Sequence, residues 1–322
     1  MMIKGAFMIY EEIKIHELLE EKIKGNFTIE PVTVMKTNDR EWNGLRLTVE
    51  GSNTSPTIYI DEAYEAYTRG ADPDDIAAKL ALEFSEAERS TPPAVTITED
   101  RSAFEGKPFT MRVLDAASNR EYLSGVPHMS VGNGLVLICD IRLAENEKGC
   151  YAAVVNNDIL AYLGKSKSEV FREALGNAWE TDGPHLFSMT EMLFKGEKTN
   201  LFDNPSAVPE IKEPEMFILS NESGIHGAAA LFYPDVQEKI SELFGSSYYA
   251  LPSSTEEFII MPEHTAGPGP KELTDMVRNA NGSVVEPEQI LCDRVFKFDR
   301  DLGKLRDVTY GREISDRVSE AR

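Results

Sequence analysis

The chain has 322 residues, of which 41% are hydrophobic, and it carries a formal net charge of −22 at pH 7. This hydrophobic fraction argues against global disorder, and the length suits two or three lobes with buried cores. The acidic excess disfavours direct binding to nucleic acid or to an anionic membrane surface. The simplest interpretation is a highly soluble cytosolic protein, and the alternative is an acidic face that meets a basic partner or mimics DNA.

The first predicted lobe covers residues 1–92 and begins with a helix. Apolar side chains recur at helical spacing over 9–24, with charged residues between them. Two strands are predicted next, over 27–37 and 41–51, because both segments are rich in β-branched and aromatic residues and a polar turn separates them. A short apolar run over 57–60 predicts a third strand.

Two helices complete this lobe, over 61–69 and 73–88. The second has a well-marked start, with Asp72 as its N-cap and Pro73 at the first helical position. Asp75 follows at the third helical position, where an acidic side chain forms an approximate capping box.

An internal echo links this lobe to the next. Residues 57–84 and 152–178 each contain a short apolar strand, an acidic or amide residue, a short helix, a glycine and a capped second helix. Gly70 and Gly164 align without gaps, each at the end of a short helix, where a left-handed residue is usual. The echo predicts an α+β or α/β protein with mixed sheets and repeated strand–helix–helix units.

The second predicted lobe covers residues 93–195. Its strands and helices are predicted over 108–117, 134–143, 151–156, 157–163 and 167–178. Ser166 and Glu169 form a clear capping box at the start of the last of these helices.

A polar segment with several prolines, residues 196–215, predicts a linker or long surface loop before a C-terminal lobe over 216–310. The elements predicted for this lobe are a strand over 216–221, a helix within 227–245, two strands that flank the turn at 252–255, a helix over 270–281 and a hairpin over 291–308. Residues 311–322 are predicted to be a tail.

Sequence motifs for a cofactor or a metal are absent. The chain contains no P-loop, dinucleotide glycine fingerprint, HExxH motif or nucleophile elbow, and its five histidines are dispersed. Three cysteines without a CxxC pair predict neither a disulfide framework nor a zinc site. No apolar stretch is long enough to span a membrane, and the first residues turn acidic too early for a secretory signal. We therefore expect a cytoplasmic protein without cofactor or metal.

The turn within 251–257 has the most site-like composition. Ser253 and Ser254 lie between apolar strands and precede Glu256 and Glu257, which strand alternation directs to opposite faces. A serine nucleophile also needs a neighbouring base, for which His226 and His264 are the candidates. The simpler interpretation is that both serines hydrogen-bond to the backbone of their own turn.

A second candidate segment covers residues 221–226. Asn221 and His226 lie between a strand end and an apolar helix start, where a histidine binds a ligand, caps a helix or is an ordinary loop residue. Similar residues follow two other strands, at Asp61 and at 156–158, and helix capping is the simpler explanation for both.

The C-terminal third resembles a bacterial domain-of-unknown-function family that is common in gut Firmicutes. The residues that carry the resemblance are Asn221, Gly227–Ala229, Tyr233–Pro234, Leu251–Ser254 and Glu257. The family has a Leu-Pro-Ser-Ser-x-His-Glu-like turn. In this chain Glu256 replaces the histidine, which weakens the case for a catalytic turn.

The resemblance covers about residues 10–300, and the whole layout is also distantly YtpQ-like. It implies a cytoplasmic bacterial protein and brings no established activity.

These observations favour a non-enzymatic protein-binding or regulatory module with an acidic surface. The acidity is uneven, and residues 61–89 contain nine acidic and three basic residues. The candidate binding residues elsewhere are Asn221, His226, Ser253, Ser254 and Glu257. One alternative is a hydrolase or transferase with its site near the turns 221–226 and 251–257. Another is a DNA-mimic-like inhibitor of a nucleic-acid-binding protein.

Overall fold

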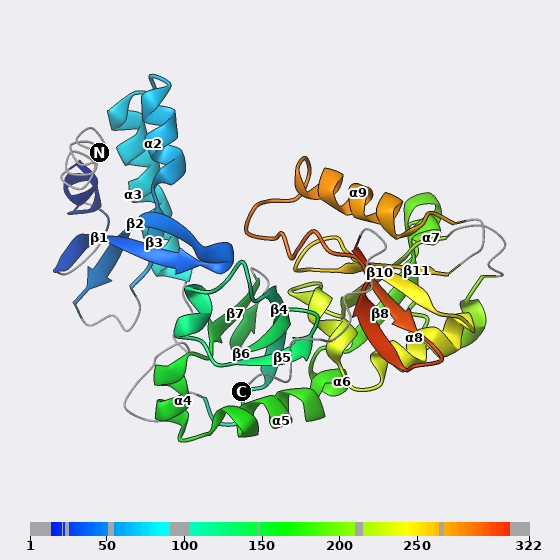
Figure 1. Cartoon of the computed structure of the whole chain (residues 1–322). Helices are drawn as coiled ribbons and strands as arrows, with labels where there is room; N and C mark the ends of the chain where they lie inside the picture. The colour runs from blue at the N-terminus through cyan, green and yellow to red at the C-terminus, as the bar shows by residue number, and fades with distance from the viewer. Residues whose placement is uncertain are drawn as a thin grey trace. The chain divides into compact units, whose positions relative to one another are not determined.

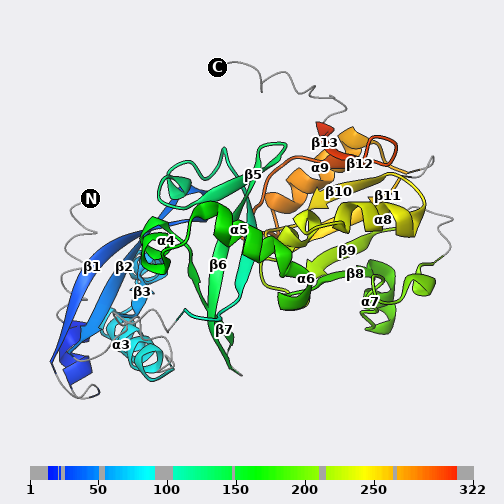
Figure 2. The same cartoon turned by 90° about the horizontal axis from the view of Figure 1, so that it is seen from below.

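The computed structural model describes residues 14–20, 22, 26–50, 55–90, 104–146, 149–209, 215–263 and 267–309. The chain divides into two compact units, one of Met1–Lys107 with Leu143–Ala152 and the other of Pro108–Arg142 with Ala153–Arg322. Both contain helices and sheets (Figures 1 and 2), so the predicted α+β class is confirmed. No described helix has the length and apolar character needed to cross a membrane.

The first unit contains a three-stranded sheet and a helix pair. The strands β1 (Phe27–Lys36), β2 (Arg40–Val49) and β3 (Thr57–Tyr59) are antiparallel and lie in sequence order. The helices are α2 (Asp61–Thr68) and α3 (Pro73–Ser90). These five elements confirm the predictions for this region. Of the predicted first helix, the structure describes residues 14–20, which are helical.

The core of the first unit lies between the sheet and α3. Ile76, Leu80 and Phe84 recur every fourth residue, which places them on one face of α3, and all three are buried. They belong to the same apolar cluster as Leu45 and Leu47 of β2, which alternate onto one face of the sheet. The helical and strand periodicities therefore direct these side chains into a shared core.

Two aspartates mark the helix starts of this unit in different ways. The Asp74 N–H donates to Asp72 Oδ1 at 2.8 Å, so Asp72 caps the start of α3 as predicted. Asp61 accepts from the backbone and side-chain N–H groups of Asn43 at 2.8 and 3.0 Å, and Ile60 holds the N-cap position of α2. The prediction that Asp61 caps its helix is therefore wrong, because its carboxylate joins the helix to β2 instead.

The second unit contains two sheets. One has the order β4–β6–β5, with strands β4 (Phe109–Asp115), β5 (His128–Gly132) and β6 (Leu135–Asn146). The strand β7 (Gly149–Val154) pairs with β6, and the residues of both strands within Leu143–Ala152 are assigned to the first unit. The other has the order β13–β12–β10–β11–β9–β8, with strands β8 (Pro184–Ser188), β9 (Phe217–Asn221), β10 (Tyr248–Pro252), β11 (Phe258–Pro262), β12 (Phe296–Asp299) and β13 (Lys304–Asp307). All pairings within this six-stranded sheet are antiparallel, which favours α+β over α/β.

The helices of the second unit are α4 (Asn157–Leu163), α5 (Lys167–Gly176), α6 (Ala178–Thr181), α7 (Met189–Lys195), α8 (Val236–Phe244) and α9 (Pro270–Asn281). Part of the predicted linker packs into this unit, because Leu201 is fully buried and its N–H donates to the Leu186 carbonyl at 2.7 Å. The lobes predicted over 1–92, 93–195 and 216–310 stay predictions, and the tail 311–322 lies outside the described residues.

The two echoed segments both fold as a strand followed by two helices. These are β3, α2 and α3 in one segment, and β7, α4 and α5 in the other. Gly70 and Gly164 both have positive φ, at 92° and 65°. Ser166 and Glu169 form the predicted capping box, and hydrogen bonds from Ser166 lower the pKa of the Glu169 carboxyl. The element order is thus as predicted, and a superposable repeat stays a prediction.

Gly164→Val is expected to lower the free energy of unfolding by roughly 1–3 kcal/mol. Gly164 is the left-handed C-cap of α4, at φ 65° and ψ 24°, a conformation that a β-branched residue adopts only with strain. Chemical denaturation measures the change. Gly176→Val is the matched control, because Gly176 lies in the same unit, has no left-handed φ and has open space around its Cα. Equal losses in both variants contradict the conformational explanation.

Candidate functional site

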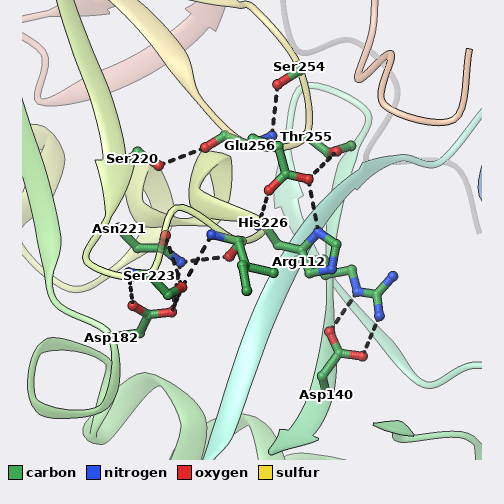
Figure 3. A network of polar contacts seen from close by, with 11 residues as sticks. Arg112, Asp140, Asp182, Ser220, Asn221, Ser223, His226, Ser254, Thr255 and Glu256 are labelled. Carbon is green, nitrogen blue, oxygen red and sulfur yellow. Dashed lines mark hydrogen bonds and ion pairs between the residues drawn. The ribbon is translucent and has the colours of Figure 1, made fainter. Parts of the chain in front are cut away.

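The two turns that the sequence singled out lie against each other in the second unit. They follow β9 and β10, which both pair with β11 in the six-stranded sheet. The Ser220 hydroxyl donates to the Glu256 carbonyl at 2.8 Å, and the Ala228 N–H donates to the Thr255 carbonyl at 3.2 Å. The His226 N–H donates to the Glu256 carboxylate (Figure 3). Residues 221–226 and 251–257 therefore form one polar cluster.

The serines of the second turn make hydrogen bonds within that turn. The Ser253 hydroxyl donates to Glu257 Oε1 at 3.1 Å, and the Glu256 N–H donates to the Ser254 hydroxyl at 3.0 Å. The backbone N–H groups of both serines also donate to the Glu257 carbonyl. Figure 3 shows Glu256 between Ser254 and His226. None of the described hydrogen bonds joins either serine to His226, and His264 lies outside the described residues.

His226 and Glu256 form the central pair of the cluster. His226 has a left-handed backbone, with φ at 54°, and its Nδ1 lies 3.4 Å from Glu256 Oε1. Burial alone would raise the pKa of the Glu256 carboxyl, but its contacts with His226 outweigh burial and lower that pKa. The composition of the two turns indicates His226 and Glu256 as candidates one by one, but not as partners of each other.

A partly buried ion pair from the four-stranded sheet adjoins this pair. Arg112 of β4 donates from Nε and Nη2 to the two carboxylate oxygens of Asp140 on β6, at 2.6 and 2.8 Å (Figure 3). Burial would lower the pKa of Arg112, but Asp140 and the more distant Glu256 raise it. Burial also raises the pKa of the Tyr122 hydroxyl beside Arg112. No local sequence pattern indicates Arg112 or Asp140, because the two residues are 28 positions apart along the chain.

Asp182 organises the other side of the cluster. Its buried carboxylate accepts four hydrogen bonds, from Arg142 Nη2, Asn221 Nδ2 and both the N–H and the hydroxyl of Ser223. Asn221 Nδ2 also donates to the Ile225 carbonyl at 2.8 Å. The predicted binding residue Asn221 is therefore part of the network that fixes its own turn.

The chemistry of the cluster is that of a compensated polar network. Each carboxylate of the cluster accepts a hydrogen bond from an amide, a guanidinium or, at Glu257, the Ser253 hydroxyl, which limits what the cluster offers to a substrate. Among the described residues, His226 Nδ1 is buried and has no hydrogen-bond partner. Within the part of the chain that the structure describes, no group of three or more His, Cys, Asp or Glu side chains is placed to hold a metal ion.

A second candidate site lies on the first unit, between α2 and α3. This groove has a volume of about 450 Å³ and is lined by Tyr59, Glu62, Ala63, Glu65, Ala66, Arg69, Ile76, Lys79, Leu80 and Glu83. Both cations in the groove are paired with glutamates one turn away, Arg69 with Glu65 at 2.5 Å and Lys79 with Glu83 at 3.8 Å. We call it the acidic groove, because three glutamates face two cations there.

The fold and these two sites define an acidic α+β protein with a compensated polar cluster and an acidic helix-pair groove. The chain belongs to the family of unknown function DUF5688, whose match covers residues 10–300. The predicted resemblance to a domain-of-unknown-function family is thereby confirmed at this level. No curated protein and no solved structure matches the chain.

Proposed function

We propose that the protein is a non-enzymatic binding module whose acidic groove takes a basic, amphipathic segment of a partner protein. The observation that carries this proposal is a groove with an apolar floor and a glutamate rim, in the most acidic part of the chain. The family resemblance supports a bacterial cytoplasmic setting for this interaction.

The lining of the groove complements such a segment in two ways. Ala63 and Ala66 are partly exposed and provide apolar surface between the helices, which suits the apolar face of a short helix. Glu62 and Glu83 lie in the same lining and attract Lys or Arg side chains at the edge of that face. Apolar contact then provides the affinity, and the glutamate charges increase the specificity for a basic partner and the association rate.

The two cations of the groove do not oppose this mode of binding. Arg69 and Lys79 form surface pairs at i,i+4 spacing with Glu65 and Glu83, and the side chains of both cations are more than 70% exposed. Pairs of this kind contribute only about 0.3–0.5 kcal/mol each, so a partner exchanges them at little cost. A basic partner that itself binds nucleic acid would be the DNA-mimic version of the same proposal.

The hydrolase or transferase alternative has less support. It requires a serine hydroxyl beside a base, whereas Ser253 and Ser254 make hydrogen bonds within their own turn. His226 has the Glu256 carboxylate, rather than a serine hydroxyl, as its neighbour.

The double variant Glu62→Lys/Glu83→Lys is expected to weaken binding of a basic amphipathic peptide by about tenfold. The probe is a fluorescein-labelled helix of Leu and Lys, and fluorescence anisotropy with the full chain measures its affinity. The matched control is Glu238→Lys/Asp275→Lys, which changes two exposed acids of the second unit by the same total charge. For the unaltered protein, we expect affinity to fall as salt is raised.

Two results contradict the proposal. The first is an equal loss of affinity in the groove variant and in the control, which means that net charge alone attracts the peptide. The second is equal binding of a Leu and Glu peptide of the same length, which means that the groove does not select charge.

A further inference from the structure

A second pocket opens in the second unit, beside α8. It has a volume of about 450 Å³ and is lined by Trp179, Phe202, Pro205, Lys239, Glu242 and Leu243. This volume lies within the usual range for small-molecule sites. The lining is mostly aromatic and aliphatic, with only two charged side chains. The rings of Trp179 and Phe202 therefore determine which ligands the pocket favours.

The two aromatic walls are held in place by the protein. The Trp179 Nε1–H donates to the Pro234 carbonyl at 3.0 Å, which fixes the indole and uses its single donor. Phe202 follows the fully buried Leu201, whose N–H is bonded to β8. The ring centroids of Trp179 and Phe202 are 5.6 Å apart and the rings are inclined at 72°. The two rings therefore form a rigid corner.

A cation already occupies one face of this corner. Lys239 Nζ lies 3.9 Å from the Trp179 ring centroid, within the range of a cation–π contact. Glu242, three residues along α8, adds a carboxylate to the same lining. An aromatic face with a nearby carboxylate favours positive charge, and the ammonium of the protein itself rests where an external cation would bind.

We propose that this pocket binds the quaternary ammonium group of a small free solute of the choline class, which displaces the Lys239 ammonium. A primary ammonium is strongly hydrated and forms hydrogen bonds in water, so Lys239 loses little when it leaves the ring. A quaternary ammonium has no hydrogen-bond donor and is weakly hydrated, so it gains more from an aromatic corner. Lys239 thereby acts as a built-in competitor for the site.

This pocket is distinct from the acidic groove proposed to bind a protein partner. It belongs to the second unit and is formed by the loop around Phe202 and the helices α6 and α8, whereas the acidic groove belongs to the first unit. The net charge of −22 raises the local concentration of any small cation, so the test must separate specific binding from this general attraction.

The experiment follows the N-methyl proton relaxation of choline by NMR as the full-length protein is added. Saturable binding of choline is expected. Its neutral carbon isostere, dimethylbutanol, has the same shape without the charge and should bind at least about tenfold more weakly. Trp179→Leu should abolish choline binding, whereas Trp42→Leu, which removes the other tryptophan, should leave it unchanged.

The Lys239→Met variant gives the sharpest readout. Lys239→Met removes the ammonium that competes for the Trp179 ring, so choline binding should tighten by about two- to fivefold. Lys167→Met, at an exposed position on α5, is the matched control and should change nothing. A variant that merely loosened the pocket would weaken binding instead.

Several outcomes overturn the proposal. One is equal binding of choline and dimethylbutanol, and another is unchanged or weaker choline binding by Lys239→Met. A third is retention of choline binding by a folded Trp179→Leu variant. Finally, binding of a trimethyllysine peptide more than about tenfold more tightly than choline would reject the free solute as the ligand.

Discussion

Asp182→Ala is expected to lower the free energy of unfolding of the second unit by about 3–5 kcal/mol, as for a broken buried ion pair. The Asp182 side chain is only 4% exposed and accepts four hydrogen bonds. Alanine takes this acceptor away from Arg142, Asn221 and Ser223 together, and each donor that stays buried adds a desolvation cost. Urea denaturation, followed by far-UV circular dichroism, measures the change.

Two further variants separate the contributions at Asp182. Asp182→Asn retains the size of the side chain and one carbonyl acceptor, so it should cost less than alanine. In the double variant Arg142→Met/Asp182→Leu, the loss should be smaller than the sum of the two single losses, because the positive charge is removed with its partner. Strict additivity, or a loss below about 1 kcal/mol for Asp182→Ala, contradicts a central role for this carboxylate.

The sequence predicts best the elements whose signals are local. Ser166 and Glu169 are three residues apart and form a capping box because a helix start needs partners for its free N–H groups. The strands β10 and β11 are separated by a short polar turn, so their pairing follows from the chain itself. Gly164 has the expected left-handed φ, because a helix commonly ends with a residue in this conformation.

Two strands that the sequence analysis did not predict depend on distant partners. The strand β8 has the sequence Pro-His-Leu-Phe-Ser, which is a weak strand signal. It forms beside β9, and the paired residues range from Ser188 with Phe217 to Pro184 with Asn221. The strand β5 contains glycine and pairs irregularly with β6, with a register shift between Ser130 and Gly132. Tertiary pairing, rather than local propensity, decides both strands.

The candidate site also contains residues that the sequence indicates locally and residues that it does not. The turns that contain Asn221, His226 and Ser253 stand out by composition, and the structure brings them into one cluster. The carboxylates that hold the cluster, Asp182 and Asp140, have no local sequence signal. Their hydrogen-bond donors Asn221 and Arg112 are 39 and 28 residues away along the chain. A polar network of this kind is visible only once sheet neighbours are known.

Gly227→Ala is expected to cost about 3 kcal/mol, at the upper end for an overpacked core. A Cβ at Gly227 would lie 2.0 Å from Ser220 Oγ, 2.6 Å from the Glu256 carbonyl oxygen and 2.8 Å from the Asn221 nitrogen. Two of these atoms belong to the backbone of the turns that form the polar cluster, so they move only if the cluster moves. The strain is therefore steric, since Gly227 has no positive φ.

Two further variants test the expected loss of stability in Gly227→Ala. Gly125→Ala introduces a Cβ into open space in the same unit, so the free energy of unfolding should change by less than about 0.5 kcal/mol. Ser220→Ala removes the nearest obstructing atom, so the double variant Ser220→Ala/Gly227→Ala should recover only part of the loss, because the backbone contacts remain. Full recovery would mean that the serine hydroxyl alone excludes a side chain, and that the two turns have room to separate.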